Sequence, residues 1–391
     1  MVRTMSDFNF DTPVNRRHTD SVKWRYPDDV LPMWVADTDF MTLPAVIEAL
    51  HKRVSHGVFG YHYESPTLRQ TVVDWVAERY GWQIDPAWII FPPDVMRGVN
   101  WTAQTVARPG DGILLQTPVY GPFFDVVRNG GFVMQDAPLV QDENGRYGLD
   151  MAAFEAALTP QTRAFLLCNP QNPTGRVFTR AELEALADFC LRHDITIIAD
   201  EIHADLLYSE SQHIPIASLS PEIARRTATF IAPSKTFNLA GLKSAVGVIP
   251  DESLRQRMEK SQRGLIARIN VLGMTAMETA YREGGPWLEA QMRYLQSNRD
   301  HLLNFIAHRG LPGVRMARPD GTFLAWLDFR ETPWADAPAQ HLLEEAKVVM
   351  NDGAWFGDAG QGFARLNFGC PRSILDEGLS RIRQALLKAD A

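Results

Sequence analysis

The middle of the chain alternates short apolar runs with amphipathic segments. Between the apolar runs the spacing is helical, as in 179–193, where Thr179 and Glu182 form a capping box at the start of the helix. Apolar runs without polar alternation are typical of a mainly parallel sheet that helices cover on both faces, so an α/β fold is expected. The predicted strands are 113–115, 132–134, 164–168, 195–199, 228–231 and 245–249.

The two ends of the chain follow other patterns. Residues 1–40 are irregular and aromatic, which is typical of an arm that packs on something else, and helices are expected from Pro44 and from about Pro66. After Pro286, helices predicted at 287–308, 338–347 and 373–388 flank strand-like runs, which indicates a smaller α+β domain. Two domains are the default for 391 residues. The expected parts are an N-terminal arm with part of the small domain (1–48), a large domain (49–285) and a C-terminal small domain (286–391).

Composition narrows the classes of function. The formal net charge of −8 at pH 7 argues against nucleic acid as a partner. The longest apolar runs have strand length, too short for a membrane span, and the first residues lack the apolar core of a signal peptide. Cys168, Cys190 and Cys370 stand far apart without metal-ligand spacing. We therefore expect reduced thiols, no metal site and a cytoplasmic location.

Three polar side chains each follow the carboxyl end of a predicted strand. They are Asn172, Asp200 and Lys235. Because ligand sites in such sheets lie outside the carboxyl ends of the strands, we expect the three to converge. Taken singly, Asn172 favours turn chemistry, Asp200 a helix N-cap and Lys235 a surface charge. Their joint occurrence favours a site.

The three side chains match what pyridoxal phosphate (PLP) requires. A lysine binds the aldehyde of this cofactor and later moves a proton at the substrate Cα, the catalytic role expected of Lys235. An acid must keep the pyridine nitrogen protonated, which suits Asp200, and Asn172 is placed to donate to the phenolic oxygen. Tyr120 is a candidate for stacking on the pyridine ring beside the substrate, although a plain core aromatic fits the sequence equally well.

Two further groups would hold the anionic ends of cofactor and substrate. Backbone amides of Val95 and Met96, at the start of a helix expected over 95–107, are candidates for the phosphate. Arg365 in the small domain could clamp the α-carboxylate of an amino-acid substrate, since a guanidinium fork matches carboxylate geometry. Taken alone, a structural salt bridge is the commoner fate of such an arginine.

Four sequence motifs carry a family resemblance. They are Asn-Pro-Gln-Asn-Pro-Thr-Gly at 169–175, Asp-Glu-Ile-His at 200–203, Ser-Lys-Thr-Phe-Asn-Leu-Ala-Gly-Leu at 234–242 and Arg-Leu-Asn at 365–367. These motifs resemble the class I/II aminotransferase superfamily of PLP fold type I. Stretches at 15–24, 31–40, 57–61 and 365–373 further resemble the MalY/PatB-type cystathionine β-lyases, which are carbon–sulfur lyases.

The resemblance implies a homodimer whose active site lies at the subunit interface. By the same likeness, Tyr61 reaches the phosphate of the neighbouring subunit's cofactor, His203 lies beside the cofactor, and Lys243 is a phosphate-binding cation. In the phosphate loop, Ser234 is expected to replace the serine that many relatives have at position 232, and Asp94 to point away or to cap the helix start.

Two reactions use the same residues once a proton leaves Cα. β-Elimination from cystathionine or related cysteine S-conjugates gives pyruvate, ammonia and a thiol, and the lyase-like stretches favour it. Transamination is the alternative, and the cation Lys243 favours it. Residues 351–353 depart from the turn that the family usually has near the substrate entrance. A non-catalytic protein that keeps the cofactor is a third hypothesis, against which the joint presence of Lys235, Asp200, Asn172 and Arg365 speaks.

Overall fold

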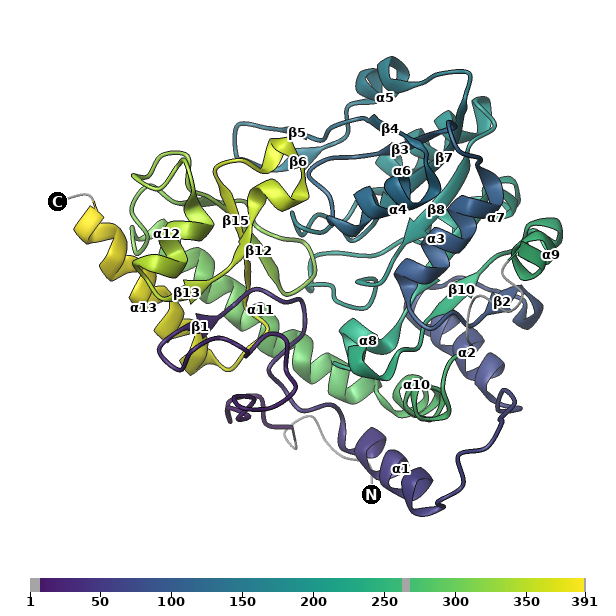
Figure 1. Ribbon diagram of the computed structural model, residues 1–391, viewed down its shortest axis with the longest axis horizontal. Coiled ribbons are helices and arrows are strands. Elements are labelled where there is room, and N and C mark those ends of the chain that lie inside the picture. The colour runs from purple at the N-terminus through teal and green to yellow at the C-terminus, as the bar shows by residue number, and fades with distance from the viewer. Residues whose placement is uncertain (1–7, 262–267, 390–391) are drawn as a thin grey trace.

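A seven-stranded sheet forms the centre of the larger part of the protein (Figure 1). The computed structural model describes residues 8–261 and 268–389. The central strands run parallel, while β10 is antiparallel to both of its neighbours. The predicted α/β class with a mainly parallel sheet is therefore confirmed. The strand order is β2 (Ile89–Ile90), β10 (Val246–Val248), β9 (Thr227–Ile231), β8 (Thr196–Asp200), β7 (Thr162–Cys168), β3 (Gly112–Leu115) and β4 (Val133–Asp136).

Helices cover both faces of this sheet, because its strands are apolar on both sides. One face packs against α3 (Val95–Val106), α4 (Pro122–Gly130) and α9 (Glu252–Ser261). The other face packs against α5 (Met151–Ala157), α6 (Arg180–Arg192) and α7 (Pro221–Arg226). The predicted capping box of α6 is present, with Thr179 and Glu182 each accepting from the other's backbone N–H.

The C-terminal part contains a second, antiparallel sheet of four strands, β11 (Arg315–Met316), β12 (Leu324–Asp328), β15 (Phe363–Asn367) and β14 (Asn351–Asp352). Its helices are α11 (Gly285–Ala307), α12 (Pro338–Glu344) and α13 (Arg372–Ala389). β1 (Leu31–Pro32) pairs in parallel with β13 (Val348–Val349), so the N-terminal arm lies beside these elements (Figure 1). The domain limits at 48/49 and 285/286 stay predictions.

Helices α1 (Pro44–Ser55) and α2 (Leu68–Tyr80) pack on α10 (Val271–Glu283). The sequence predicts α1 with Val46, Ile47, Leu50 and Val54 on one apolar face. Val46 is buried and Ile47 and Leu50 are partly buried, but Val54 is half exposed. Helix α10 and the hairpin β5–β6 (Val140–Gln141, Tyr147–Gly148) have no counterpart in the sequence-based prediction. Within residues 8–261 and 268–389, no helix is both long enough and apolar enough to cross a membrane.

Candidate active site

A cavity of about 600 Å³ opens at the carboxyl ends of the parallel strands. It collects side chains from β7, β8, α3 and the turn after β9, so the convergence expected at this sheet edge is present. The residues proposed from sequence that line it are Val95, Met96, Tyr120, Asn172, Asp200, His203, Ser234, Lys235 and Lys243. Their chemical roles stay predictions, whereas their gathering in one cavity is observed.

Lys235 lies on a one-turn helix, α8 (Pro233–Thr236), rather than in an open loop. Its Nζ donates to the carbonyl oxygen of Ala36 at 2.6 Å. Burial, reinforced by the positive charge of Arg365, lowers the pKa of the lysine to about 8. A lysine with this pKa can exist as a free amine near neutral pH, the form that attacks an aldehyde.

Asp200 ends β8 and faces the same cavity. Burial raises the pKa of its carboxyl to about 7, against the opposing effects of the Ile202 N–H, which donates to Oδ1 at 3.1 Å, and of Lys235. A carboxyl whose ionised form is this poorly solvated binds a cationic ligand group strongly, because the cation restores the charge balance. A protonated pyridine nitrogen is such a group.

His203 supplies an unused polar atom at the cavity wall. It is buried, and its Nδ1 has no hydrogen-bond partner in the part of the chain that the structure describes. Burial, together with the positive charges of Lys235 and Arg365, holds the pKa of the imidazole well below its usual range, so the ring is neutral. A buried orphan of this kind indicates a missing partner, and a polar ring-bearing ligand fits it.

Arg365 on β15 reaches the site from the small domain. Its Nη1 donates to Asn172 Oδ1 at 2.9 Å, and its Nη2 donates to Trp34 O at 2.9 Å and to Asn351 Oδ1 at 2.5 Å. Burial lowers the pKa of the guanidinium to about 10, so it remains charged at neutral pH without a carboxylate within hydrogen-bonding distance among the described residues. A buried cation held only by neutral oxygens is suited to an incoming carboxylate.

The start of α3 forms the end of the cavity where an anion could bind. Asp94 caps this helix, with Oδ1 accepting from the Arg97 N–H at 2.9 Å, as expected for this position. Its Oδ2 forms ion pairs with Arg97 and, at 3.5 Å, with Lys243 Nζ. The free N–H groups of the first turn and these cations, together with Ser234, can hold a phosphate, while Asp94 offsets part of that charge.

Tyr61 is not among the residues that line the cavity. Its side chain is fully exposed in the segment between α1 and α2. Several contributors escaped the sequence reasoning, among them Arg97, which pairs with Asp94 at the start of α3. Ala36 contributes a backbone carbonyl, which leaves no trace in side-chain patterns, whereas Cys168 was interpreted only as a buried thiol and Asn351 only as part of an unusual turn.

Comparison with known proteins identifies the family. A model described as aminotransferase class I and II matches residues 28–382. The chain belongs to the class I and II aminotransferase family. Cystathionine β-lyase PatB of Bacillus subtilis is 40% identical over 387 residues, covering 97% of this chain and 100% of the relative. Protein MalY of Escherichia coli is 35% identical over 394 residues, covering 97% and 99%.

Solved structures of other family members agree with this placement. Cystalysin from Treponema denticola, which contains a pyridoxal 5'-phosphate cofactor, has a TM-score of 0.94 at 32% identity, covering 97% of this chain and 99% of that one. A PLP-bound putative aminotransferase from Clostridium difficile has a TM-score of 0.94 at 38% identity, covering 97% and 100%. Both the resemblance found in the sequence and the predicted fold type I are thereby confirmed.

Proposed function

We propose that this protein is a PLP-dependent carbon–sulfur β-lyase. The observation that carries the proposal is a cavity lined by a lysine of lowered pKa and an aspartate of raised pKa, with the buried Arg365 hydrogen-bonded to Asn172 in its wall. The relative PatB favours the lyase reaction, since it is named a cystathionine β-lyase and is matched over its full length. The substrate class is amino acids with sulfur on Cβ, such as cystathionine.

The residues present fit the cofactor. Lys235 would hold its aldehyde carbon, Asp200 its pyridine nitrogen, and the first turn of α3 with Ser234 and Lys243 its phosphate. Bound in this way, PLP supplies an electron sink that acidifies the Cα–H bond of the substrate. Tyr120, which packs edge-on against Trp355 at a ring-centroid distance of 5.5 Å, lies on the cavity wall where it can limit ring movement.

The chain's own residues then perform the proton and carboxylate work. Arg365 binds the substrate carboxylate and so orients the Cα–H bond. Lys235 Nζ, with a pKa of about 8, accepts the Cα proton. The Cβ–S bond breaks, the thiolate leaves with the bonding electrons, and the lysine can return the proton to it. Water converts the released enamine into pyruvate and ammonia.

One assay separates this function from its alternatives. Purified protein loaded with PLP is incubated with cystathionine, and separately with amino acids plus a 2-oxo acid, while pyruvate, thiol and new amino acid are measured. The lyase gives pyruvate and thiol in equal amounts, and Lys235→Ala gives neither. Efficient amino-group transfer without pyruvate would establish the aminotransferase instead, which the name of the Clostridium difficile relative supports. The absence of product in both assays would favour a non-catalytic protein that binds the cofactor.

We further infer a homodimer that shares its active sites. Exposed large apolar side chains cluster at the end of α1 and in the segment before α2, where a second copy could cover them. They are Val54, Val58, Phe59, Tyr61 and Tyr63. Sedimentation velocity tests this: Phe59→Ser should shift the protein toward monomer, and a wild-type monomer at micromolar concentration would refute it.

The location in the cell stays a proposal. Cys168, Cys190 and Cys370 are all free and buried. Free thiols persist in a reducing compartment, which supports the cytoplasm. Localisation of a tagged protein by cell fractionation tests this inference.

A further inference from the structure

The loop 34–40 connects the N-terminal arm to the candidate active site. Every backbone carbonyl from Trp34 to Thr38 accepts a hydrogen bond from a side chain of β15 or of the segment that contains Lys235. The donors and distances are Arg365 to Trp34 O at 2.9 Å, Asn367 to Val35 O at 2.5 Å and to Asp37 O at 2.7 Å, Lys235 to Ala36 O at 2.6 Å, and Asn238 to Thr38 O at 2.9 Å.

These contacts make the loop a common support for two functional groups. The amine of Lys235 comes from the large sheet, and the guanidinium of Arg365 comes from the small sheet. The carbonyls that receive them belong to residues 36 and 34, two positions apart on the same loop. A displacement of the loop therefore changes the position of the amine and of the guanidinium together.

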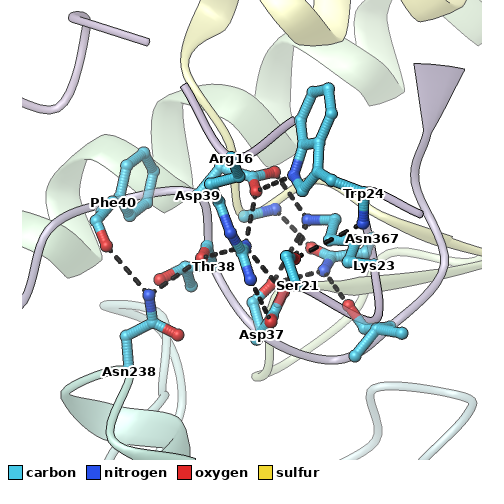
Figure 2. A network of polar contacts seen from close by, with 12 residues as sticks. Arg16, Ser21, Lys23, Trp24, Asp37, Thr38, Asp39, Phe40, Asn238 and Asn367 are labelled. Carbon is cyan, nitrogen blue, oxygen red and sulfur yellow. Dashed lines mark hydrogen bonds and ion pairs between the residues drawn. The ribbon is translucent and has the colours of Figure 1, made fainter. Parts of the chain in front are cut away.

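The arm also holds this loop, through charges. Arg16 forms a fork on Asp37, with Nη1–Oδ1 at 3.1 Å and Nη2–Oδ2 at 2.7 Å, and its Nη1 also donates to Asp39 Oδ1 at 2.7 Å. Asp39 further accepts from Lys23 Nζ at 2.6 Å and from Trp24 Nε1 at 2.7 Å. Figure 2 shows Arg16 between the two carboxylates, and we call these five residues the arm clamp.

The clamp is electrically balanced and largely closed to water. It pairs two cations, Arg16 and Lys23, with two carboxylates, and the side chains of Lys23 and Asp39 are each only 1% exposed. Removing one member leaves a buried charge without its partner, which is far costlier than losing a surface ion pair. The balance therefore holds the loop in one conformation, which a surface salt bridge would not do.

We propose that the arm clamp is a positioning device for catalysis. Arg16, Lys23 and Asp39 act through the loop carbonyls to set the amine of Lys235 and the guanidinium of Arg365, without touching the substrate. The inference rests on the proposed function in so far as these two groups are taken to be the catalytic and carboxylate-binding ones. It gives a physical role to stretches 15–24 and 31–40, which the sequence showed only as a resemblance.

Arg16→Gln tests the proposal, and Arg17→Gln is its matched control. The two arginines are neighbours with side-chain exposures of 20% and 22%. Arg17 donates to Val30 O at 2.9 Å and to Pro27 O at 3.1 Å, and it stacks on Trp24. Its loss removes these contacts, including the stacking on the clamp residue Trp24, while the hydrogen bonds from Arg16 and Lys23 to Asp37 and Asp39 remain.

The expected result is a combined change in both kinetic constants. Arg16→Gln should lower kcat, because the lysine is displaced, and raise KM, because the arginine is displaced, with kcat/KM falling about 10- to 100-fold. Arg16→Lys keeps the charge but loses the fork, so its kcat/KM should lie between those of the wild type and Arg16→Gln. Arg17→Gln should stay within about 3-fold of wild type. A variant that merely unfolds in part would lower kcat with KM unchanged.

Hydrogen–deuterium exchange of the apoprotein gives a readout that needs no reaction. The amides of residues 34–40 should exchange faster in Arg16→Gln than in the wild type and in Arg17→Gln. Equal exchange in all three proteins, or equal kinetic losses in the two variants, would overturn the proposal. A wild type that releases no pyruvate would refute the lyase function but not the clamp proposal. The clamp would then be tested by the exchange of residues 34–40 and by the KM of amino-group transfer in the same variants.

Discussion

Replacing Asp200 by Asn should raise the stability of the apoprotein relative to the wild type by an amount that grows as the pH rises. Burial raises the pKa of this carboxyl from 3.8 to about 7. Between these values the unfolded chain has lost the proton and the folded chain keeps it, so the folded state loses stability with rising pH. At 1.36 kcal/mol per pKa unit, the Asp200 carboxyl lowers the free energy of unfolding by about 1.7 kcal/mol at pH 5 and by about 4 kcal/mol at pH 8.

The quantity to measure is the difference in free energy of unfolding between Asp200→Asn and the wild type. A buried amide hydrogen left without a partner costs about 1–3 kcal/mol, but this cost does not depend on pH. Urea unfolding of both apoproteins from pH 5 to pH 8 should therefore show the stability of Asp200→Asn gaining about 2.5 kcal/mol on the wild type. With PLP bound, the wild type should be more stable than Asp200→Asn, because the protonated pyridine nitrogen pairs with the carboxylate of Asp200. A difference that stays constant across this pH range would refute the reasoning.

Four further outcomes follow from the site. Lys235→Ala should keep its fold but lose the visible absorbance of bound PLP and all lyase activity; a retained band would refute the assignment. Apoprotein should take up PLP faster as the pH rises through about 8, the pKa of Lys235, and then level off in a stopped-flow measurement. Arg365→Lys should raise KM about 10- to 100-fold, because a lysine cannot form the fork; an unchanged KM would place the substrate carboxylate elsewhere. Tyr61→Phe should weaken PLP binding in equilibrium dialysis if the partner subunit supplies this hydroxyl, whereas unchanged binding would contradict that role.

The parallel strands and the sheet edge at which the site lies were predictable from sequence. Runs such as 164–168 and 195–199 are apolar throughout, which a sheet covered on both faces requires. Asp200 directly follows the second run and Asn172 lies four residues after the first, so the topology alone brings them together. The start of α3 was predictable for a similar reason, since Asp94 is a good capping residue before an apolar-periodic segment.

Features that depend on contacts distant in sequence were not predictable in this way. The carbonyl of Ala36 approaches Lys235 across 199 positions, and any residue type can supply a carbonyl. Val54 has helical apolar spacing and yet lies exposed on α1, because spacing indicates an apolar face but not what covers it. Lys23 has the sequence appearance of a surface charge, and only the fold shows it buried against Asp39.

One physical cause links the shifted groups of the site. Burial raises the pKa of Asp200 and lowers those of Lys235, His203 and Arg365, so each is shifted toward its uncharged form. Such a site is costly to fold when empty, because groups that could be solvated elsewhere are kept from water. A ligand that carries a phosphate, a carboxylate and a protonated ring nitrogen supplies the countercharges that these groups lack. The arm clamp differs, since its charges are already paired within the chain. The clamp charges therefore need no ligand, while the unpaired groups are kept for the cofactor and the substrate.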